Sequence, residues 1–322
     1  MSVPDHLLGF LNIAKPHGVS SRSVVDQVQK HLRLQTGQRI KVGHSGTLDP
    51  FADGVLILGV GRATSLLQIL QHGSKSYQAT FCLGKTSETL DLESPVESVA
   101  MPDDLSSQQI EETLVQFLGD IQQVPPKHSA IRVAGKRAYE LARKGRDFEM
   151  PSRQVKIHQL SLLNWITPHL ELEVQCGGGT YIRTLGQDIA KTLGTDAVMT
   201  KLTRTESCGM LLQDAIPLAG FLERPFRRET LLSPAQTLER QLTWEVDWDE
   251  ASRFTNGLFT HKLQARLDDY PAPRPTRRHP LLLRYEGQLA GVIYWEPQNE
   301  KREGRWRTLV NLGNLLQQKS GG

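Results

Sequence analysis

The sequence predicts a mixed α/β protein that consists of a large N-terminal domain and a smaller, β-rich domain at the C terminus. Its 322 residues exceed the usual size of one domain, and 38 % of them are apolar, which is enough for a sizeable core. Apolar runs typical of strands alternate with segments of helical spacing. Near the C terminus a proline-rich stretch precedes a hairpin pattern. We therefore expect one domain at residues 1–248 and a second at residues 249–322.

The first expected elements are a strand, a turn and a helix. An apolar run at residues 7–13 indicates the strand, and Lys15-Pro16-His17-Gly18 indicates the turn. Ser20 or Ser21 can cap the helix, because a serine oxygen accepts a hydrogen bond from a free N–H of the first helical turn. The apolar residues at helical spacing in this helix are Val24, Val25, Val28 and Leu32.

The middle of the chain supplies more strands, one helix and an insertion. Strands are expected at residues 55–60, 77–83 and 170–175. Residues 184–193 have the pattern of a helix that ends at Gly194, since glycine readily adopts the left-handed conformation found after helices. A basic, helix-like insertion at about residues 125–150 separates the later strands from the earlier ones.

The C-terminal segment differs from the rest in composition. A linker rich in proline and arginine at residues 270–280 leads into two strands, at 281–285 and 289–295, joined by a Glu286-Gly287 turn. Residues 251–322 hold 12 Lys and Arg against 6 Asp and Glu, whereas residues 1–250 hold 26 against 29. A basic tail on a near-neutral body is consistent with an anionic partner.

Several classes of protein are excluded by what the sequence lacks. Cys82, Cys176 and Cys208 are far apart and show no CxxC spacing, which argues against a disulfide framework or a zinc site. No apolar run approaches the roughly 20 residues of a transmembrane helix, and the first residues do not have the pattern of a signal peptide. The glycines near Arg62 lack the GK[ST] of a phosphate loop. We expect a cytoplasmic protein with no metal and no cofactor.

The segment Gly43-His44-Ser45-Gly46-Thr47-Leu48-Asp49-Pro50 places one histidine and one aspartate in a glycine-rich loop. Asp49 followed by proline is also the pattern of a helix start, with the aspartate as cap. Alternatively, a loop aspartate can act as nucleophile or base. That role requires a nearby cation to keep the carboxylate ionised and aimed, and Arg183 is a candidate, although it could equally be a surface arginine.

The chain resembles the TruB family of tRNA pseudouridine synthases, bacterial type, over at least residues 9–204. The matching segments, in chain order, are Lys15-Pro16-x-Gly18-x-Ser20-Ser21, the segment from Gly43 to Leu56, Lys75-Ser76-Tyr77 with Leu83-Gly84 and Ser87-x-Thr89-x-Asp91, Pro125-Pro126-x-x-Ser129-Ala130 with Gly135-x-Arg137-x-Tyr139, Gly179-Thr180-Tyr181-Ile182-Arg183-Thr184-Leu185, and Leu202-x-Arg204. The departures from the family pattern are Ser45, Thr47, Phe51, Ser65, His128 and Arg132.

The resemblance implies a fold, a reaction and a substrate. The fold would be a mixed sheet flanked by helices with a central active-site cleft, followed by a PUA-like RNA-binding domain. The reaction would convert the T-loop uridine conventionally numbered 55 to pseudouridine, after the base is flipped out. The partner would be the T arm of tRNA. No membrane and no obligate protein partner are implied, and we expect a monomer.

The resemblance also implies roles for individual residues. Asp49 would be the catalytic carboxylate, attacking the ribose carbon, attacking C6 of the base or removing a ribose proton. The substrate-binding residues would be His44, Tyr77, Tyr181, Arg183 and Leu202. The basic residues in contact with RNA would be Lys75, Arg132, Lys136, Arg137 and Arg143. Without the resemblance, Tyr77 could be a core residue and His44 a turn residue.

Two other functions fit the same residues. A non-catalytic RNA-binding protein would keep the fold, but it would not need a carboxylate facing RNA phosphates. A glycoside hydrolase would also use Asp49 at an anomeric carbon, but that chemistry normally requires a second, paired carboxylate. The sequence does not identify such a partner for Asp49.

Overall fold

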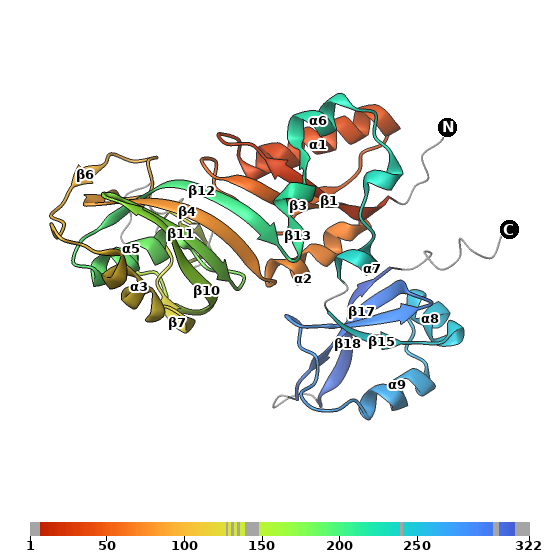
Figure 1. Ribbon diagram of the computed structural model, residues 1–322. Coiled ribbons are helices and arrows are strands. Elements are labelled where there is room, and N and C mark those ends of the chain that lie inside the picture. The colour runs from red at the N-terminus through yellow and green to blue at the C-terminus, as the bar shows by residue number, and fades with distance from the viewer. Residues whose placement is uncertain are drawn as a thin grey trace.

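The computed structural model describes residues 7–312 except 127, 130–131, 134–135, 139–147, 239–240 and 299–302, and it shows two units (Figure 1). The elements of the larger unit are β1 (Leu8–Lys15), α1 (Ser21–Thr36), β2 (Val42–His44), β3 (Asp53–Gly61), η1 (Arg62–Leu66), α2 (Leu67–Gln71), β4 (Lys75–Leu83), β5 (Lys85–Thr86), β6 (Glu97–Ser98), α3 (Ser107–Val115), β7 (Gly119–Gln123), β8 (Arg132–Val133), β9 (Lys136–Arg137), β10 (Arg153–Ile166), β11 (His169–Cys176), α5 (Ile182–Thr192), β12 (Ala197–Ser207), β13 (Met210–Leu211), η2 (Leu212–Asp214), β14 (Ile216–Pro217), α6 (Leu218–Glu223), η3 (Arg228–Thr230) and α7 (Pro234–Thr237). Those of the smaller unit are β15 (Leu242–Glu245), α8 (Trp248–Thr255), α9 (His261–Asp268), β16 (Leu281–Tyr285), β17 (Gln288–Glu296) and β18 (Arg305–Asn311).

A ten-stranded sheet forms the larger unit, with the strand order β14-β1-β3-β12-β4-β11-β10-β7, and with β2 paired to β3 and β13 to β12. β12 runs parallel to β3 and β1 runs parallel to β14, whereas the other pairs are antiparallel. This mixed sheet with flanking helices confirms the fold class that the sequence predicts.

Strand β3 is buried because both of its faces are covered. Its run of Val55 to Val60 is fully buried, as expected for a continuous apolar strand without alternation. Leu56, Leu58 and Val60 pack against α1 and α6 on one face, while Val55 and Ile57 pack toward α2 and the smaller unit on the other. The loop before β3 therefore starts from a rigid support.

The first helix forms as the sequence predicts, and the two serines at its start have different roles. Ser20 is the cap, and its side chain accepts from the backbone N–H of Ser23. The helix ends at Gly37 in the left-handed conformation, with a φ of 73°. Ser21 instead turns toward the loop that carries Asp49 (described below). The later helix, α5, begins two residues before the expected start at 184, so that Arg183 lies in its first turn.

The smaller unit is a four-stranded sheet of order β15-β16-β17-β18, with α8 and α9 beside it (Figure 1). The expected hairpin forms between β16 and β17, and Glu286 and Gly287 have positive φ angles of 46° and 72°. β15 pairs with β16 and lies before the boundary expected after residue 248. The C-terminal sheet therefore begins earlier in the chain, at Leu242.

A shared apolar core joins the two units. Phe10, Ile57 and Leu66 of the larger unit belong to one buried cluster with Leu282 and Val292 of the smaller one. Arg62 also donates a hydrogen bond of 3.1 Å to the backbone oxygen of Asn311. Because this contact is apolar and buried, the smaller unit is attached firmly and is not simply tethered to the larger one.

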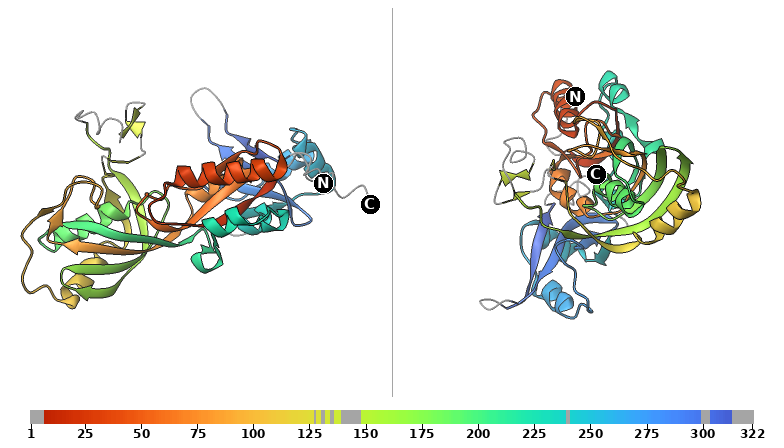
Figure 2. Two further views of the ribbon diagram at one scale, coloured as in Figure 1. Left: turned by 90° about the horizontal axis from the view of Figure 1, so that it is seen from above. Right: turned by 90° about the vertical axis from the view of Figure 1, so that its left-hand side faces the viewer.

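The insertion differs from expectation in its described part. A helix-like segment is expected there, but residues 132–133 and 136–137 form a two-stranded hairpin, β8 and β9. The two residues that connect them in the sequence are Ala134 and Gly135, and a glycine in a two-residue connection favours a hairpin. Both views in Figure 2 place this hairpin away from the sheet, on the side toward which β17 and β18 also extend.

Two features concern the chain as a whole. Cys82, Cys176 and Cys208 are all free thiols. Within the described residues, no helix is long and apolar enough to span a membrane.

Candidate active site

The loop between β2 and β3, which carries Asp49, is held by Lys15 at the end of β1 and by Ser21 at the start of α1. The Ser21 hydroxyl donates to the Leu48 oxygen and accepts from the Leu48 N–H, each at 2.8 Å. The Lys15 ammonium donates to the oxygens of Val19 at 2.6 Å and Pro50 at 3.2 Å. Asp49 therefore lies between two residues whose backbone is held in place.

This loop settles one alternative that the sequence leaves open. Asp49 does not begin a helix, because strand β3 follows it at Asp53. Its backbone oxygen accepts from the Ala52 N–H at 3.1 Å, which closes a turn. The side chain is 34 % exposed, so the carboxylate is accessible from outside. Asp49 is a loop carboxylate and not a helix cap.

A glycine allows the strand after this loop to lie against its neighbour. Gly54 has a φ of +107°, and a Cβ at this position would lie 2.3 Å from the Arg204 backbone oxygen. β3 pairs with β12 at this point, with Gly54 opposite Arg204. Only glycine permits this approach, which brings the Asp49 loop next to β12 and β4.

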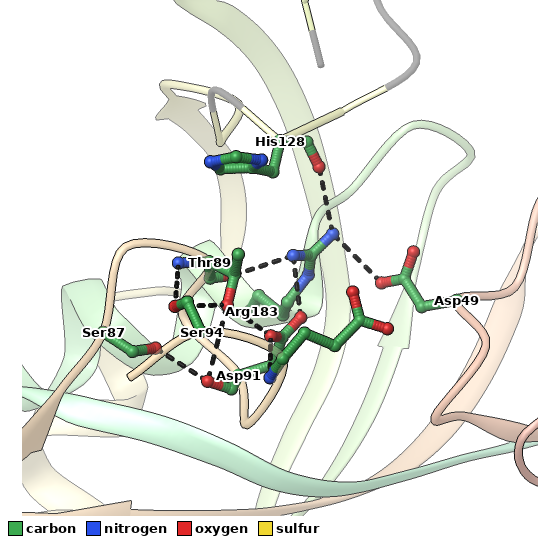
Figure 3. A network of polar contacts seen from close by, with 8 residues as sticks. Asp49, Ser87, Thr89, Asp91, Ser94, His128 and Arg183 are labelled. Atoms are coloured by element: carbon green, nitrogen blue, oxygen red, sulfur yellow. Dashed lines mark hydrogen bonds and ion pairs between the residues drawn. The ribbon is translucent and has the colours of Figure 1, made fainter. Parts of the chain in front are cut away.

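Arg183 links the Asp49 loop to a second loop, as Figure 3 shows. It is 6 % exposed and lies in the first turn of α5. One terminal nitrogen, Nη2, is 3.1 Å from the Asp49 carboxylate, and the other, Nη1, is 2.9 Å from the Asp91 carboxylate. Nη1 also donates to the Thr89 oxygen at 2.7 Å. The guanidinium group is therefore shared between two carboxylates.

Asp91 is the functional residue that sequence reasoning missed. It is 1 % exposed, and its carboxylate accepts hydrogen bonds from the Thr89 hydroxyl and from the Glu93 backbone N–H, besides its ion pair with Arg183. The Ser87 hydroxyl donates to the Asp91 backbone oxygen at 2.7 Å. The signal was present in the motif Ser87-x-Thr89-x-Asp91, whose polar residues all belong to this network.

The electrostatic surroundings raise the pKa of Asp49. Burial is the largest cause, because it disfavours the charged carboxylate. The positive charge of Arg183 lowers this pKa in opposition, and the negative charge of Asp91 raises it. Lys15 adds a smaller lowering effect. Arg183 is therefore the main group that favours the ionised form of Asp49, and the negative charge of Asp91 partly offsets its effect.

Tyr77 and Leu202 lie in the same apolar cluster as Leu48, the neighbour of Asp49. Tyr77 is on β4, directly opposite Arg204 of β12, and is 7 % exposed. Burial raises the pKa of the Tyr77 hydroxyl, and the positive charge of Arg204 acts in the opposite direction. Arg204 is itself buried and donates to the Val55 oxygen at 2.6 Å, which ties β12 to β3.

His44 and Tyr181 are the two remaining residues expected to bind the substrate. His44 ends β2, and burial, followed by the nearby charges of Arg204 and Arg22, lowers the pKa of its imidazole. The ring is therefore neutral at physiological pH. Tyr181 is the residue that precedes α5, and its ring lies below the Arg153 guanidinium, at 4.7 Å from the guanidinium carbon to the ring centroid.

Lys75 does not fit its expected contact with RNA. It is 5 % exposed, and its ammonium donates to the backbone oxygens of Leu70, Gln71 and Gly73. Burial is the main cause that lowers its pKa. Lys75 holds the turn after α2 and does not reach the surface, so this expectation was wrong.

The remaining expected RNA contacts lie in the insertion. Arg132, Lys136 and Arg137 are described only by their backbone, in β8 and β9. Arg143 lies outside the described residues. His128, at the start of the insertion, accepts from Arg183 Nη2 through its backbone oxygen at 3.4 Å. Among the described residues, no group of three His, Cys, Asp or Glu side chains is placed to hold a metal ion.

The fold is shared with solved structures. The chain matches a Cbf5-Nop10-Gar1 complex with a TM-score of 0.68 at 21 % identity, over 97 % of this chain and 89 % of that one. It matches an H/ACA RNP bound to a substrate RNA containing 2′-deoxyuridine with a TM-score of 0.64 at 21 % identity, over 94 % and 83 % of the two chains. The chain therefore has the overall fold of the proteins in these two complexes.

The sequence comparisons define the family. Residues 31–182 match the model of the TruB family pseudouridylate synthase N-terminal domain. The tRNA pseudouridine synthase B of Gloeothece citriformis is 41 % identical over 78 % of this chain and 81 % of its own length. That of Moorella thermoacetica is 37 % identical over 90 % and 95 %. The chain belongs to the TruB family of pseudouridylate synthases.

Proposed function

We propose that this protein isomerises uridine 55 in the T loop of tRNA to pseudouridine, with Asp49 as the catalytic residue. The relatives are named tRNA pseudouridine synthase B, which supports tRNA as the substrate. The observation that carries the proposal is the partly exposed Asp49 carboxylate, 3.1 Å from a buried arginine that a second, buried carboxylate holds in place.

The proposed reaction requires no group donor and no change of oxidation state. The bond between N1 of the base and C1′ of the ribose breaks, the base turns, and a bond from C5 to C1′ forms. The proton on C5 leaves and N1 takes up a proton, so the mass of the RNA is unchanged. Asp49 attacks the ribose carbon, attacks C6 of the base or removes a ribose proton, and each of these routes needs its ionised form.

The remaining residues take their roles from their positions around Asp49. The flipped uracil stacks on the ring of Tyr77, an interaction worth about 1–3 kcal/mol, and packs against Leu202. Tyr181 lines the pocket and assists removal of the C5 proton. His44, in its neutral form, helps to displace the T-loop bases. Arg183 binds no base and keeps Asp49 ionised.

The contacts with the rest of the tRNA come from the insertion and the smaller unit. The basic residues Arg132, Lys136, Arg137 and Arg143 hold the T arm through its phosphates. The smaller unit acts as a PUA-like RNA-binding domain. The enzyme works in the cytoplasm as a monomer, without a metal, a cofactor or a protein partner.

The buried position of Asp91 disfavours the glycosidase alternative. That reaction needs two carboxylates that both reach the substrate. Asp91 shares Arg183 with Asp49, but it is 1 % exposed and its oxygens are already engaged. A protein that only binds RNA gains nothing from an exposed carboxylate beside phosphates.

Incubation of the protein with an unmodified tRNA transcript separates the three functions. The proposal predicts pseudouridine at position 55 and an RNA of unchanged mass, by nuclease digestion and mass spectrometry. Release of free uracil would indicate a hydrolase, and binding with unchanged nucleosides would indicate a non-catalytic protein. A transcript with cytidine at position 55 is the control, and it should bind without forming any product.

A further inference from the structure

Two residues at the base of the basic insertion point to a role in the active site. The insertion leaves the sheet after Gln123, the last residue of β7, and returns at Arg153, the first residue of β10. The two strands are antiparallel, and Arg153 is the direct partner of Gln123 in their register. The residues that begin and end the insertion are therefore neighbours, although the sequence separates them.

Gln123 binds the backbone of Tyr181 through both ends of its amide. Its oxygen accepts from the Tyr181 N–H at 2.8 Å, and its nitrogen donates to the Tyr181 oxygen at 3.0 Å. The residue is 1 % exposed, so these bonds are shielded from water. A buried amide with both groups satisfied fixes a backbone position strongly, since loss of either bond leaves a polar group unpaired.

Arg153 binds the same turn from its other side. Its guanidinium donates to the Gly179 oxygen and lies over the Tyr181 ring at 4.7 Å. Gly179 has a φ of +96°, and a Cβ there would lie 3.7 Å from the guanidinium carbon of Arg153. The ring of Tyr181 is thus held by Arg153 while its backbone is held by Gln123.

The turn that these residues hold carries two side chains of the active site. Tyr181 immediately precedes α5, and Arg183 lies in the first turn of that helix. A third contact from the insertion reaches the same place, since Arg183 donates to the His128 backbone oxygen at 3.4 Å. A small displacement of this turn would move both Tyr181 and the partner of Asp49.

We propose that Gln123 and Arg153 are positioning residues, which set the orientation of Tyr181 and Arg183 and thereby connect the RNA-binding insertion to the catalytic step. This inference rests on the proposed function. A cation beside an RNA-binding insertion could instead bind a phosphate, and the two roles predict different measurements. A positioning residue affects the rate of conversion in the bound complex, whereas a phosphate contact affects affinity and its dependence on salt.

The first experiment replaces Arg153 and measures binding and chemistry separately. Arg153→Met keeps the aliphatic stem, and Arg153→Lys keeps the charge but lacks the planar group that both stacks and donates. We expect both variants to lower the single-turnover rate at saturating enzyme about tenfold or more. Their tRNA affinity should stay within about twofold of wild type, and the salt slope should be unchanged.

Lys156→Met is the matched control, because Lys156 is an exposed cation on the same strand. It should leave the single-turnover rate at the wild-type value. The proposal is overturned if Arg153→Lys restores the wild-type rate, or if Arg153→Met changes only the affinity and removes about one unit of salt slope. The wild-type reaction is run in parallel. Failure of the wild type to convert tRNA would reject the proposed function itself, whereas normal wild-type and variant rates would reject only the present inference.

The second experiment tests whether Gln123 acts on the same turn. Gln123→Met has a similar length but lacks both hydrogen bonds to Tyr181, so we expect a fall in single-turnover rate at unchanged affinity. The double variant with Arg153→Met should be about as slow as the slower of the two single variants, because both changes loosen the same turn before α5. Melting temperatures confirm that each variant is folded. Independent, multiplying effects of the two changes would contradict a shared role.

Discussion

The two carboxylates that share Arg183 differ in almost every other respect. Asp49 lies on a loop between strands, is 34 % exposed, and has the Arg183 ion pair as its principal interaction. Asp91 is 1 % exposed and also accepts from Thr89 and Glu93. Both lie within 3.1 Å of the same guanidinium group.

This difference indicates a division of labour. A buried carboxylate with both oxygens engaged can fix the direction of an arginine, but it cannot reach a substrate. A carboxylate with one partner and partial exposure can react, but it needs that partner to remain charged. The arginine thus links a structural aspartate to a reactive one, and substitutions on the two sides should have different consequences.

After the loss of Asp49 itself, replacement of Arg183 should have the largest effect on the rate. Arg183→Ala removes the main cause that lowers the pKa of Asp49, so the carboxylate becomes harder to ionise and loses its direction. We expect the single-turnover rate to fall by about a hundredfold or more. Arg183→Lys should also be impaired, because an ammonium group cannot bridge two carboxylates in the same geometry.

The exposed Lys191 in the last turn of α5 offers a control for Arg183. Lys191→Ala should leave the rate unchanged. A rate for Arg183→Ala equal to that of wild type would show that the ion pair does not contribute to catalysis.

Replacement of Asp91 should affect stability most. Among the ion pairs of the described residues, Asp91→Asn leaves the buried Arg183 with the partly exposed Asp49 as its partner. Breaking a buried ion pair costs about 3–5 kcal/mol. Chemical denaturation should show a fall in the free energy of unfolding of this order. Asp103→Asn, on the exposed surface, should show none. If Asp91→Asn is as stable as wild type, Asp91 does not anchor the arginine.

Asp49→Asn should behave in the opposite way. Folding raises the pKa of Asp49, which means that the ionised carboxylate destabilises the folded state above its ordinary pKa. An asparagine removes that charge and keeps an oxygen for Arg183. The free energy of unfolding at neutral pH should therefore be unchanged or higher. A clear decrease would show that Asp49, like Asp91, stabilises the folded state.

The pH dependence of the reaction should shift in opposite directions in Arg183→Ala and in Asp91→Asn. Activity falls at low pH as Asp49 becomes protonated, and its raised pKa places this fall above the pH expected for an ordinary aspartate. Arg183→Ala should move the fall to higher pH. Asp91→Asn should move it to lower pH, because a nearby negative charge is lost. Single-turnover rates across a pH series test this, and equal or reversed shifts would refute it.

The smallest expected effect concerns the basic tail. Five of its cations pair with carboxylates, namely Arg253, Lys262, Arg266, Arg305 and Arg307. Arg277 and Arg278 are exposed, and no ion pair of theirs occurs among the described residues. Replacing both with serine should reduce the salt slope of tRNA binding by about two units. Arg253→Ser, which removes an already paired cation, should change the slope less.

Much of the fold could be predicted because its causes are local. The apolar run of β3, the cap of α1 and the Glu286-Gly287 turn each depend on a few consecutive residues. The start of the smaller unit was harder to predict from the sequence, because β15 is short and is recognised only by its pairing with β16. The hairpin in the insertion was missed because its charged residues give little periodic signal.

The site was only partly predictable because its contacts are distant in sequence. Asp49 and Arg183 were found through motifs, but the pairing of Arg183 with Asp91 spans 92 positions. Gln123 was missed for the same reason, since it binds a residue 58 positions away. Lys75 was misassigned because lysines are rarely buried, and here three backbone oxygens replace its water.

Release of the C5 proton reports directly on whether Asp49 drives the isomerisation. A tRNA transcript with tritium at C5 of its uridines is mixed with excess enzyme, and tritium released to water is measured with time. Wild type should release one equivalent, from position 55. Asp49→Asn should bind the tRNA with similar affinity but release tritium at least about a thousandfold more slowly. Release by Asp49→Asn at the wild-type rate would show that Asp49 is not the catalytic residue.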